Sequence, residues 1–495
     1  MRSATLGIVI PAHPVETVRA AERAVMARLP ESTLMHRAAA ALDVECAARL
    51  RAAAGGVVGR EVVVLVGSGD NGGDALLAAA RLARRGAGVT VLTTSPHAHE
   101  AGLAAVASAG GRVRPYLRGD EKTCGAADLL LDGIVGIGGR GGLRDPLTAL
   151  PDALAGGRPV VVAVDLPSGL DADSGAVTGI VLRADVTVAF GTAKPVHVLG
   201  PAAAWCGRLV VVDIGIRDGL PDPVLQRVEP ADVARRWRRA GAGDDKYSRG
   251  VVGVVAGGLD YPGAAVLAVE GAVRAGAGMV RYLGPDHPTE LVRQRRPEVV
   301  AGGGRVQAWV LGPGVSPEDP EQQQRIIDAL ASGEPAVVDA GALGGLPATL
   351  SAQHVLTPHA GELVRLLADL GESVERAAVE ADPLTHARRV AQATGATVLL
   401  KGSVTTVVDP SGRVRSAAAA PHWLSTAGAG DVLAGILGAA LASRPHDPAL
   451  DVAADAAVLH GWAATLASAG GPLAALDVAD AVPAALTSLP GWSSR

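Results

Sequence analysis

Two glycine-rich segments, one in each half of the chain, combine backbone that could bind an anion with acidic side chains. GSGDNGGD at residues 67–74 follows an apolar run, and TAGAGD at residues 426–431 precedes an Ala- and Leu-rich stretch. Glycines at the start of a helix let backbone N–H groups approach a phosphate. Asp431 directly follows the second set of glycines, so its carboxylate could take a proton from a hydroxyl that attacks the phosphate. The structural alternative is a tight turn whose aspartate caps the helix.

Oxygen-bearing side chains end two further apolar runs in the first half of the chain. Asp132 ends LLLD, Asp165 ends VVAVD, and Ser168 follows three residues later. Ligands of parallel α/β sheets gather at the carboxyl ends of the strands, so we expect Asn71, Asp132 and Ser168 to converge beside the first glycine-rich loop. Oxygen ligands suit a hard cation and not zinc. Taken singly, each of these side chains could instead be a helix cap or a turn residue.

The second half also has polar residues after apolar runs, although the two halves show no clear repeat of each other. Lys401 begins KGSVT after the run ATVLL, and this segment suits the phosphate and ribose of a nucleotide. His359 lies in LTPHAGE and Gly314 in LGPG, each after another apolar run. A surface lysine and a loop histidine remain the alternatives for Lys401 and His359. His460 lies within a helical pattern, where we expect it to pack in the interior.

The apolar runs predict the strands that must position these residues. Continuous β-branched runs alternate with helical stretches over residues 61–213 and again from residue 251, which is typical of parallel strands buried on both faces. The predicted fold class is therefore α/β with two doubly wound domains. A chain of 495 residues exceeds the roughly 250–300 at which a single core stops growing. We place the boundary in the polar stretch at residues 230–245, which gives domains at residues 1–230 and 231–495.

Composition excludes several classes of function. With 19% charged residues, 48% hydrophobic residues and a net charge of −5, the chain is typical of globular proteins, and its scattered arginines predict no nucleic-acid partner. The densest basic run, Arg235 to Arg239, is interpreted as a solvated face, with an anion site as the alternative. The three cysteines lack the spacing of a zinc site or a disulfide framework. Neither a signal segment nor a membrane span is evident, so we predict a cytoplasmic protein that forms a homo-oligomer and has no membrane partner.

The motifs of the first half resemble the NAD(P)HX epimerase family. GSGDNGGD, LLLDGIVGIGG, VVAVDLPSGLDAD and FGTAKP occur in that order within residues 15–215. The family has a Rossmann-like, three-layer fold and interconverts the C6 epimers of hydrated NADH and NADPH, which are called NADHX and NADPHX. The resemblance implies a potassium ion held by Asn71, Asp132 and Ser168, and it implies Asp165 as the acid/base at C6 with Lys194 as an auxiliary contact.

The same resemblance implies further contacts with the substrate in two loops. These contacts fall on Asp70, Asn71, Gly72, Gly73, Asp74, Gly136, Ile137, Gly138, Gly139, Arg140, Gly141 and Gly142. Asp70 departs from the family, which usually has asparagine there. The departure adds a negative charge close to the expected phosphates.

The motifs of the second half resemble the ADP-dependent NAD(P)H-hydrate dehydratases, which are ribokinase-like. KYSRG, GGLDYPGAAVLA, LGPG, LTPHAGE, LLKG and AGAGD occur within residues 246–488. In this family ADP converts the C6 hydroxyl of the S epimer into a phosphorylated leaving group, and the products are NADH or NADPH, AMP and phosphate. The implied contacts are Asp431 for the reacting hydroxyl, Ala264, Gly314 and His359 for the hydrate, and Lys401, Gly402, Ser403, Val404, Thr405 and Gly430 for the nucleotide.

The dehydratase resemblance leaves the metal and the choice of nucleotide open. Mg²⁺ is expected in this site. ADP and ATP would present the same phosphates to AGAGD. Gly341 departs from the family, in which an acidic residue is common at this position, and the departure puts a secondary contact or a ligand of a metal-bound water in doubt.

The two resemblances explain each other in one chain. A dehydratase that acts on one epimer leaves the other stranded, and an epimerase on the same chain lets both be recovered. The alternative is a ribokinase-like vitamin kinase with a non-catalytic N-terminal binding module. Vitamin kinases share AGAGD, but they account neither for LTPHAGE nor for the motifs within residues 15–215.

Overall fold

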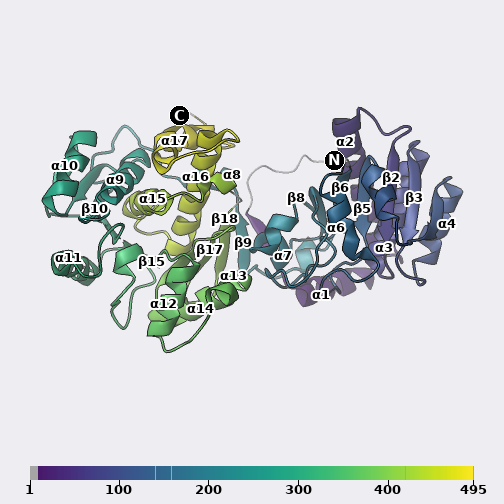
Figure 1. Cartoon of the computed structure of the whole chain (residues 1–495), viewed down its shortest axis with the longest axis horizontal. Helices are drawn as coiled ribbons and strands as arrows, with labels where there is room; N and C mark the ends of the chain where they lie inside the picture. Colours follow the sequence, from purple (N-terminus) through teal and green to yellow (C-terminus); the bar gives the residue numbers. More distant parts are fainter. Residues whose placement is uncertain (1–8, 140, 158, 418–419, 494–495) are drawn as a thin grey trace. The chain divides into compact units, whose positions relative to one another are not determined.

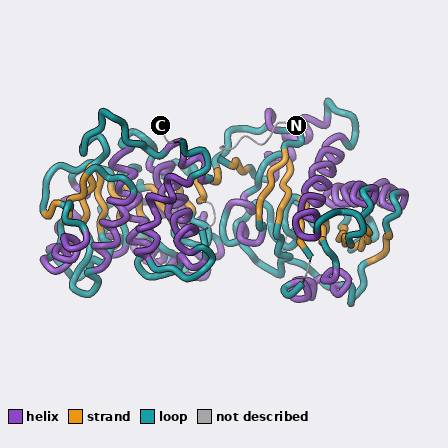
Figure 2. The backbone as a smooth tube through the Cα atoms, turned by 90° about the horizontal axis from the view of Figure 1, so that it is seen from above, coloured by secondary structure: helices purple, strands orange, loops and turns teal. Residues whose placement is uncertain are grey.

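The computed structural model describes residues 9–139, 141–157, 159–417 and 420–493. The chain divides into two compact units (Figure 1). Residues 11–223 form the smaller unit, and residues 224–495 together with those up to Ile10 form the larger one. Each unit has its own sheet, and within each unit helices cover the strands (Figure 2). The predicted α/β class is confirmed.

The smaller unit is built on seven strands, and every neighbouring pair is parallel. The strand order is β4-β3-β2-β5-β6-β7-β8. The chain therefore starts at β2, moves outward to β4 and returns to β5 on the other side, so β2 and β5 flank a switch point of the kind at which α/β sheets bind ligands. The strands are β2 (Glu61–Val66), β3 (Gly88–Thr93), β4 (Arg112–Pro115), β5 (Leu129–Gly133), β6 (Val160–Val164), β7 (Val186–Phe190) and β8 (Arg208–Val212).

Helices pack on both faces of this sheet and make three layers. Alternate strand residues face opposite ways, so Val62 and Val64 join a core with α1 to α4, whereas Val63 and Leu65 join a core that includes Cys124 of α5. The helices are α1 (Val15–Met26), α2 (Thr33–Ala54), α3 (Asp70–Arg84), α4 (Glu100–Ser108), α5 (Glu121–Ala126), α6 (Leu150–Leu154) and α7 (Pro195–Val198).

The larger unit contains an eleven-stranded mixed sheet. Its order is β1-β9-β18-β17-β16-β15-β14-β13-β10-β11-β12. The strands from β16 to β12 run parallel, whereas β17 is antiparallel to both of its neighbours. The strands are β1 (Ile10–Ala12), β9 (Leu225–Val228), β10 (Val251–Val255), β11 (Met279–Tyr282), β12 (Val300–Ala301), β13 (Ala308–Leu311), β14 (Ala336–Val338), β15 (His354–Leu356), β16 (Thr397–Leu400), β17 (Thr406–Val408) and β18 (Val414–Ala417).

Small side chains dominate the packing of this larger unit. A Cβ on Gly271 of α9 would collide with the Val432 carbonyl oxygen of α15, and one on Gly435 of α15 would collide with the Ala268 carbonyl oxygen. These two helices therefore touch backbone to backbone, which suits a chain with only 2% aromatic residues. The helices are α8 (Pro230–Arg236), α9 (Gly263–Arg274), α10 (Asp286–Arg295), α11 (Pro320–Ala331), α12 (Ala360–Asp369), α13 (Arg376–Ala381), α14 (Pro383–Thr394), α15 (Ala429–Ser443), α16 (Ala449–Ser468) and α17 (Ala475–Ser488).

The chain passes from the smaller unit to the larger one between Pro223 and Val224, which is before the predicted boundary at residues 230–245. β9 pairs in parallel with β18, and Val233 and Trp237 are buried in the core of the larger unit. The polar residues around Val233 and Trp237 made this stretch look like a linker. Nothing in the sequence indicated β9 either, because its pairing partner β18 lies far away along the chain. In the part of the chain that the structure describes, no helix has both the length and the apolar character needed to cross a membrane.

A cut between Pro223 and Val224 is expected to leave two fragments that each fold. The fragment of residues 224–495 keeps β9 to β18, and its core is made by its own residues. A fragment that begins at Gly241 loses β9 and Trp237, and we expect its thermal midpoint to fall by about 10 °C. Thermal unfolding followed by circular dichroism compares the two fragments, and equal midpoints would show that the boundary is misplaced.

Candidate active sites

The first glycine-rich loop lies where β2 ends and α3 begins. A Cβ on Gly67 would collide with the Ile134 carbonyl oxygen, so the loop lies directly against the chain that follows β5. Asp70 is the first residue of α3. The loop that carries Gly136, Ile137, Gly138 and Gly139 follows β5 at the same edge of the sheet, and Arg140 lies outside the described residues. Glycine is needed at position 142, where φ is +84° and a Cβ would lie 2.9 Å from the Ile180 backbone nitrogen.

The structure brings Asp132 and Ser168 together at this edge. The Ser168 hydroxyl donates to Oδ1 of Asp132 at 2.6 Å, and the Ser168 backbone N–H donates to Oδ2 at 2.8 Å. The Val135 backbone N–H in turn donates to the Ser168 hydroxyl oxygen at 3.1 Å. Asp132 is completely buried, and this burial raises the pKa of its carboxyl to about 6.

Asn71 reaches the same segment from α3. A Cβ on Gly136 would lie 3.1 Å from the Asn71 side-chain oxygen. The Asn71 side-chain nitrogen is buried and has no hydrogen-bond partner among the described residues. The amide oxygen and nitrogen can exchange places by a rotation of the side chain, so this position can equally present an oxygen. The three predicted cation ligands thus surround the chain that follows β5.

Asp165 and Lys194 form a buried ion pair across adjacent strand ends. Lys194 Nζ donates to Asp165 Oδ1 at 2.5 Å and to the Phe190 carbonyl oxygen at 3.0 Å. The Phe190 backbone N–H also donates to Asp165 Oδ1, at 3.1 Å. The φ of Asp165 is +62°, a strained conformation that persists only where the surroundings hold it. His197 contributes to this, because its Nδ1 accepts from the Lys194 N–H, so its Nε2 donates to the Asp165 carbonyl oxygen at 2.7 Å.

Asp74 is a second carboxyl group near this ion pair. It lies one turn after the start of α3, and its Oδ1 is buried without a hydrogen-bond partner in the described chain. Burial raises the pKa of Asp74 well above its usual value, and the charges of Asp165, Asp70 and Glu22 raise it further. The protonated form of Asp74 is therefore favoured relative to an exposed aspartate, while Asp165 is paired with an ammonium. Two carboxyl groups in such different environments are suited to acid and base roles.

Two residues of α1 also approach this site, and the sequence interpretation had missed them. Arg19 Nη2 lies 3.6 Å from the position that a Cβ would take on Gly138. Burial raises the pKa of Glu22, whereas the charge of Lys194 lowers it. Both stand in an ordinary amphipathic helix, where charged residues usually face solvent. No motif could have indicated their role.

The dehydratase motifs gather at the carboxyl edge of the larger sheet. Asp339, Thr357 and Lys401 directly follow the parallel strands β14, β15 and β16. Lys401 Nζ donates to Asp339 Oδ1 at 2.8 Å and lies 3.8 Å from Glu362 Oε2. The Thr357 hydroxyl donates to the same Asp339 oxygen at 2.8 Å. Neither Asp339 nor Glu362 was among the predicted site residues, although Glu362 lies within LTPHAGE.

Asp431 lies at the start of α15 and faces this cluster. Burial raises the pKa of its carboxyl to about 7, Asp339 and Glu362 raise it, and Lys401 lowers it. A Cβ on Gly430 would lie 3.3 Å from Lys401 Nζ, so the AGAGD loop and the lysine are neighbours. A carboxyl that titrates near neutral pH is well matched to proton transfer.

The remaining predicted residues border this edge. A Cβ on Gly314 would lie 2.5 Å from the Ala264 Cβ, so these two positions touch. The His359 side chain is 54% exposed, and its backbone N–H donates to Glu362 Oε2 at 2.8 Å. After Lys401, Gly402 and Ser403 are exposed, and Val404 and Thr405 are partly exposed. A nucleotide could therefore reach the segment at residues 401–405 from solvent.

Two other positions have structural explanations. A side chain at Gly341 would collide with the Val315 carbonyl oxygen, which accounts for the absence of an acidic residue there. His460 of α16 is buried as predicted, and burial lowers its pKa to about 4 against the effect of a hydrogen bond with the Ala429 backbone. His460 is therefore neutral at physiological pH and supports the start of the AGAGD loop.

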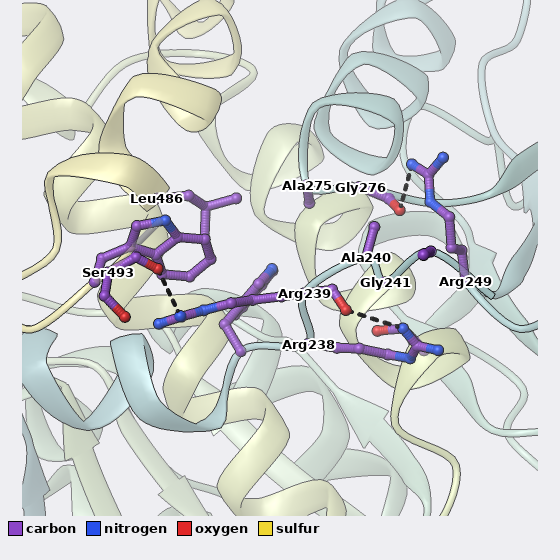
Figure 3. A pocket seen from close by; sticks show the side chains of 13 residues that line it. Arg238, Arg239, Ala240, Gly241, Arg249, Ala275, Gly276, Leu486 and Ser493 are labelled. Carbon is purple, nitrogen blue, oxygen red and sulfur yellow. Dashed lines mark hydrogen bonds between the residues drawn. The ribbon is translucent and has the colours of Figure 1, made fainter. Parts of the chain in front are cut away.

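A pocket of about 560 Å³ lies at the opposite end of α15 and carries no assigned chemistry. Figure 3 shows Arg238, Arg239 and Arg249 around it, with their guanidinium groups pointing in different directions. Arg238 pairs with Asp244, and Arg239 stacks on Trp492. Since Arg235 and Arg236 also pair, with Asp232 and Asp455, the basic run is engaged within the fold and is not the solvated face that we expected.

Comparison with known proteins decides the family. The family model described as NAD(P)H-hydrate dehydratase matches residues 252–483, and the one described as YjeF-related protein N-terminus matches residues 31–196. A bifunctional NAD(P)H-hydrate repair enzyme from Mycobacterium tuberculosis is 46% identical over 444 residues, covering 87% of this chain and 89% of its own length. The chain belongs to this family.

Other members of the NAD(P)H-hydrate repair family match almost the whole chain. The Mycobacterium leprae enzyme is 42% identical over 92% of this chain and 94% of its own length. The Corynebacterium glutamicum enzyme is 34% identical, with coverages of 96% and 98%. The chain is also similar to a crystallised Bacillus subtilis ADP/ATP-dependent NAD(P)H-hydrate dehydratase, at 26% identity and a TM-score of 0.48, over 53% of this chain and 97% of that one. The assignment rests on the sequence relatives, which span both units.

Asp74→Asn is expected to stabilise the smaller unit more at pH 8 than at pH 5. Because the folded-state pKa of Asp74 is raised, its contribution to stability is complete below the unfolded-state pKa, near 4, and is lost as the pH rises toward the folded-state value. Asparagine does not ionise and avoids this loss. Thermal midpoints at the two pH values measure the effect, with exposed Asp152→Asn as the control. An equal shift at both pH values would contradict a raised pKa of Asp74.

Proposed function

We propose that this chain repairs hydrated NADH and NADPH at two separate sites. The smaller unit interconverts the R and S epimers at C6, and the larger unit dehydrates the S epimer with ADP. The observation that carries the proposal is that each unit holds a buried or half-buried Lys–Asp pair at its carboxyl strand edge, beside a glycine-rich loop that begins a helix. Relatives that match both units support one chain with both activities.

In the larger unit, Asp431 would accept the proton of the C6 hydroxyl as its oxygen attacks the β-phosphorus of ADP. The new O–P bond forms as the bond to AMP breaks. Phosphate then leaves C6 with both electrons of the C–O bond, and a proton lost from C5 leaves the C5–C6 double bond of NADH or NADPH. Lys401 and the N–H groups at the start of α15 would stabilise the negative charge on the phosphates.

In the smaller unit, Asp165 would act as the acid/base at C6. Its carboxylate is held by Lys194 and by the Phe190 N–H, so it is fixed before the substrate arrives. The charge of Asp165 contributes to the raised pKa of Asp74, which favours a protonated carboxyl that would donate a hydrogen bond to the substrate. Asp70, the glycines of both loops and Arg19 would surround the rest of the dinucleotide.

A potassium ion would fit between Asn71, Asp132 and Ser168. The carboxylate of Asp132 is buried, the described groups that donate to it are uncharged, and the side-chain nitrogen of Asn71 lacks a partner among the described residues. A monovalent cation would compensate this buried charge. Its chemistry would be structural and electrostatic, since it would hold the loop after β5 in the form that meets the substrate.

Mg²⁺ would reach the larger unit bound to the phosphates of the nucleotide. Among the described residues, no cluster of three or more His, Cys, Asp or Glu side chains is suited to hold a metal ion. Magnesium often binds chiefly through substrate phosphates. The cytoplasmic location, the homo-oligomer and the absence of nucleic-acid and membrane partners stay predictions from the sequence.

Asp431→Asn is expected to lower the turnover number of dehydration by about 10² to 10⁴-fold, because an amide cannot accept the hydroxyl proton. The affinity for ADP should change little. The measurement is the reappearance of reduced-nicotinamide absorbance from the pure S epimer. Epimerisation by the same preparation controls for folding. Near-normal dehydration would defeat the assignment, because asparagine caps a helix about as well as aspartate.

Asp132→Asn is expected to raise the potassium concentration for half-maximal epimerisation by about tenfold or more, because the substitution removes the only formal charge of the site. A potassium titration of the epimerisation rate measures this change. Dehydration of the S epimer should stay at the wild-type rate. Identical titration curves for variant and wild type would exclude a cation at Asp132.

A further inference from the structure

Asp339 is the most enclosed charged group of the dehydratase edge, and none of the motifs above includes it. It follows β14, its side chain is 3% exposed, and its Oδ1 accepts from both Thr357 and Lys401. Its other oxygen lies 3.9 Å from the position that a Cβ would take on Gly430. The carboxylate therefore lies between the end of β16 and the AGAGD loop.

We infer that Asp339 is a positioning residue that holds the Lys401 ammonium beside Gly430, where the phosphates of the nucleotide and the Asp431 carboxylate meet. The inference deepens the proposed dehydratase function and rests on it. Asp339 acts through Lys401 and need not touch the substrate.

Lys401 needs such a partner because its side chain is long and flexible. Its backbone is fixed, since its N–H donates to the Pro358 carbonyl oxygen at 2.8 Å, but four rotatable side-chain bonds lie between the backbone and the ammonium. The alternative partner, Glu362 Oε2, is 3.8 Å away and already accepts from the His359 N–H. Asp339 is in turn fixed by the Thr357 hydroxyl. The three strand ends are thus linked by hydrogen bonds, from the Thr357 hydroxyl to Asp339 and from Lys401 to the same carboxylate.

The charge of Asp339 also acts on Asp431. Three charged side chains that bear on this carboxyl come from different elements: Asp339 after β14, Lys401 after β16 and Glu362 of α12. His460 of α16 lies beside the same loop, at the Ala429 backbone, and is neutral. Burial, Asp339 and Glu362 raise the pKa of Asp431, and Lys401 lowers it. Burial lowers the pKa of Lys401, but Asp339 and Glu362 outweigh it and leave the pKa raised. Asp339 thus favours the charged form of Lys401 and helps to hold the pKa of Asp431 near neutral pH.

The test is Asp339→Asn, which keeps the size of the side chain and removes its charge. The pKa of Asp431 should fall, because a negative neighbour is lost and the ammonium is free to approach. Asp431 must be ionised to act as a base, so the acidic limb of the kcat/KM profile for dehydration should move to lower pH. The turnover number at the optimum should fall about 10- to 100-fold, because the ammonium no longer stays beside the phosphates.

A second readout does not depend on activity. Lys401 should be acylated faster at pH 8 in Asp339→Asn than in the wild type, measured by mass spectrometry with exposed Lys246 as the internal reference. The matched control is Asp409→Asn. Asp409 is also a buried strand-end aspartate, but it follows antiparallel β17 and pairs with Arg413. The control should leave both the profile and the Lys401 labelling at wild-type values.

The outcomes separate the two claims. An unshifted pH profile together with unchanged Lys401 labelling in Asp339→Asn would overturn the positioning role. The wild type could also show no ADP-dependent dehydration while Lys401 is labelled faster in Asp339→Asn alone. This pair of results would support the positioning of Lys401 and reject the proposed reaction. Equal effects of Asp339→Asn and Asp409→Asn would mean that loss of any buried aspartate loosens the unit, and this result would also overturn the inference.

Discussion

Both sites depend on one geometric constraint, which is that parallel strands end at a common edge of their sheet. In the smaller unit Asp132 lies at the end of β5, and Asp165 and Lys194 follow β6 and β7; in the larger unit Asp339 and Lys401 follow β14 and β16. The backbone beyond these ends is free to turn, so side chains that are far apart in the sequence can share one space. Helices begin at the same edge and present their N–H groups to it.

The two units use this edge to build similar ion pairs with different access to solvent. The Asp165–Lys194 pair is sealed, with side chains 8% and 1% exposed. The Asp339–Lys401 pair leaves its lysine 22% exposed. A sealed pair fixes the geometry of its carboxylate, which suits the acid/base role proposed for Asp165. A half-open pair leaves the ammonium able to meet an incoming phosphate, which suits the nucleotide exchange that the proposed dehydration requires.

The strand-end rule explains how far the sequence could predict the fold and the sites. It led correctly to the convergence of Asp132 and Ser168, because each residue ends or closely follows an apolar run. Asp339 directly follows such a run too, so the same rule could have identified it. The sequence interpretation considered only Gly341 in this segment. Glu22 could not be found, because a helix surface shows nothing of what it will face. The structure divides the units after Pro223, ahead of the stretch expected from the sequence, because β9 pairs with β18, and β10 to β17 lie between these two strands in the sequence.

The contact between α9 and α15 has a consequence for how the larger unit tolerates substitution. Replacing a helical glycine by alanine is usually favourable by about 1 kcal/mol, since alanine is the best helix former. At Gly271 and Gly435 the same change would push one backbone into another and shift α15, whose first turn carries Asp431. Even the mildest of replacements is therefore disruptive where these two helices touch. The position of Asp431, the proposed base, depends on two residues that have no side chain at all.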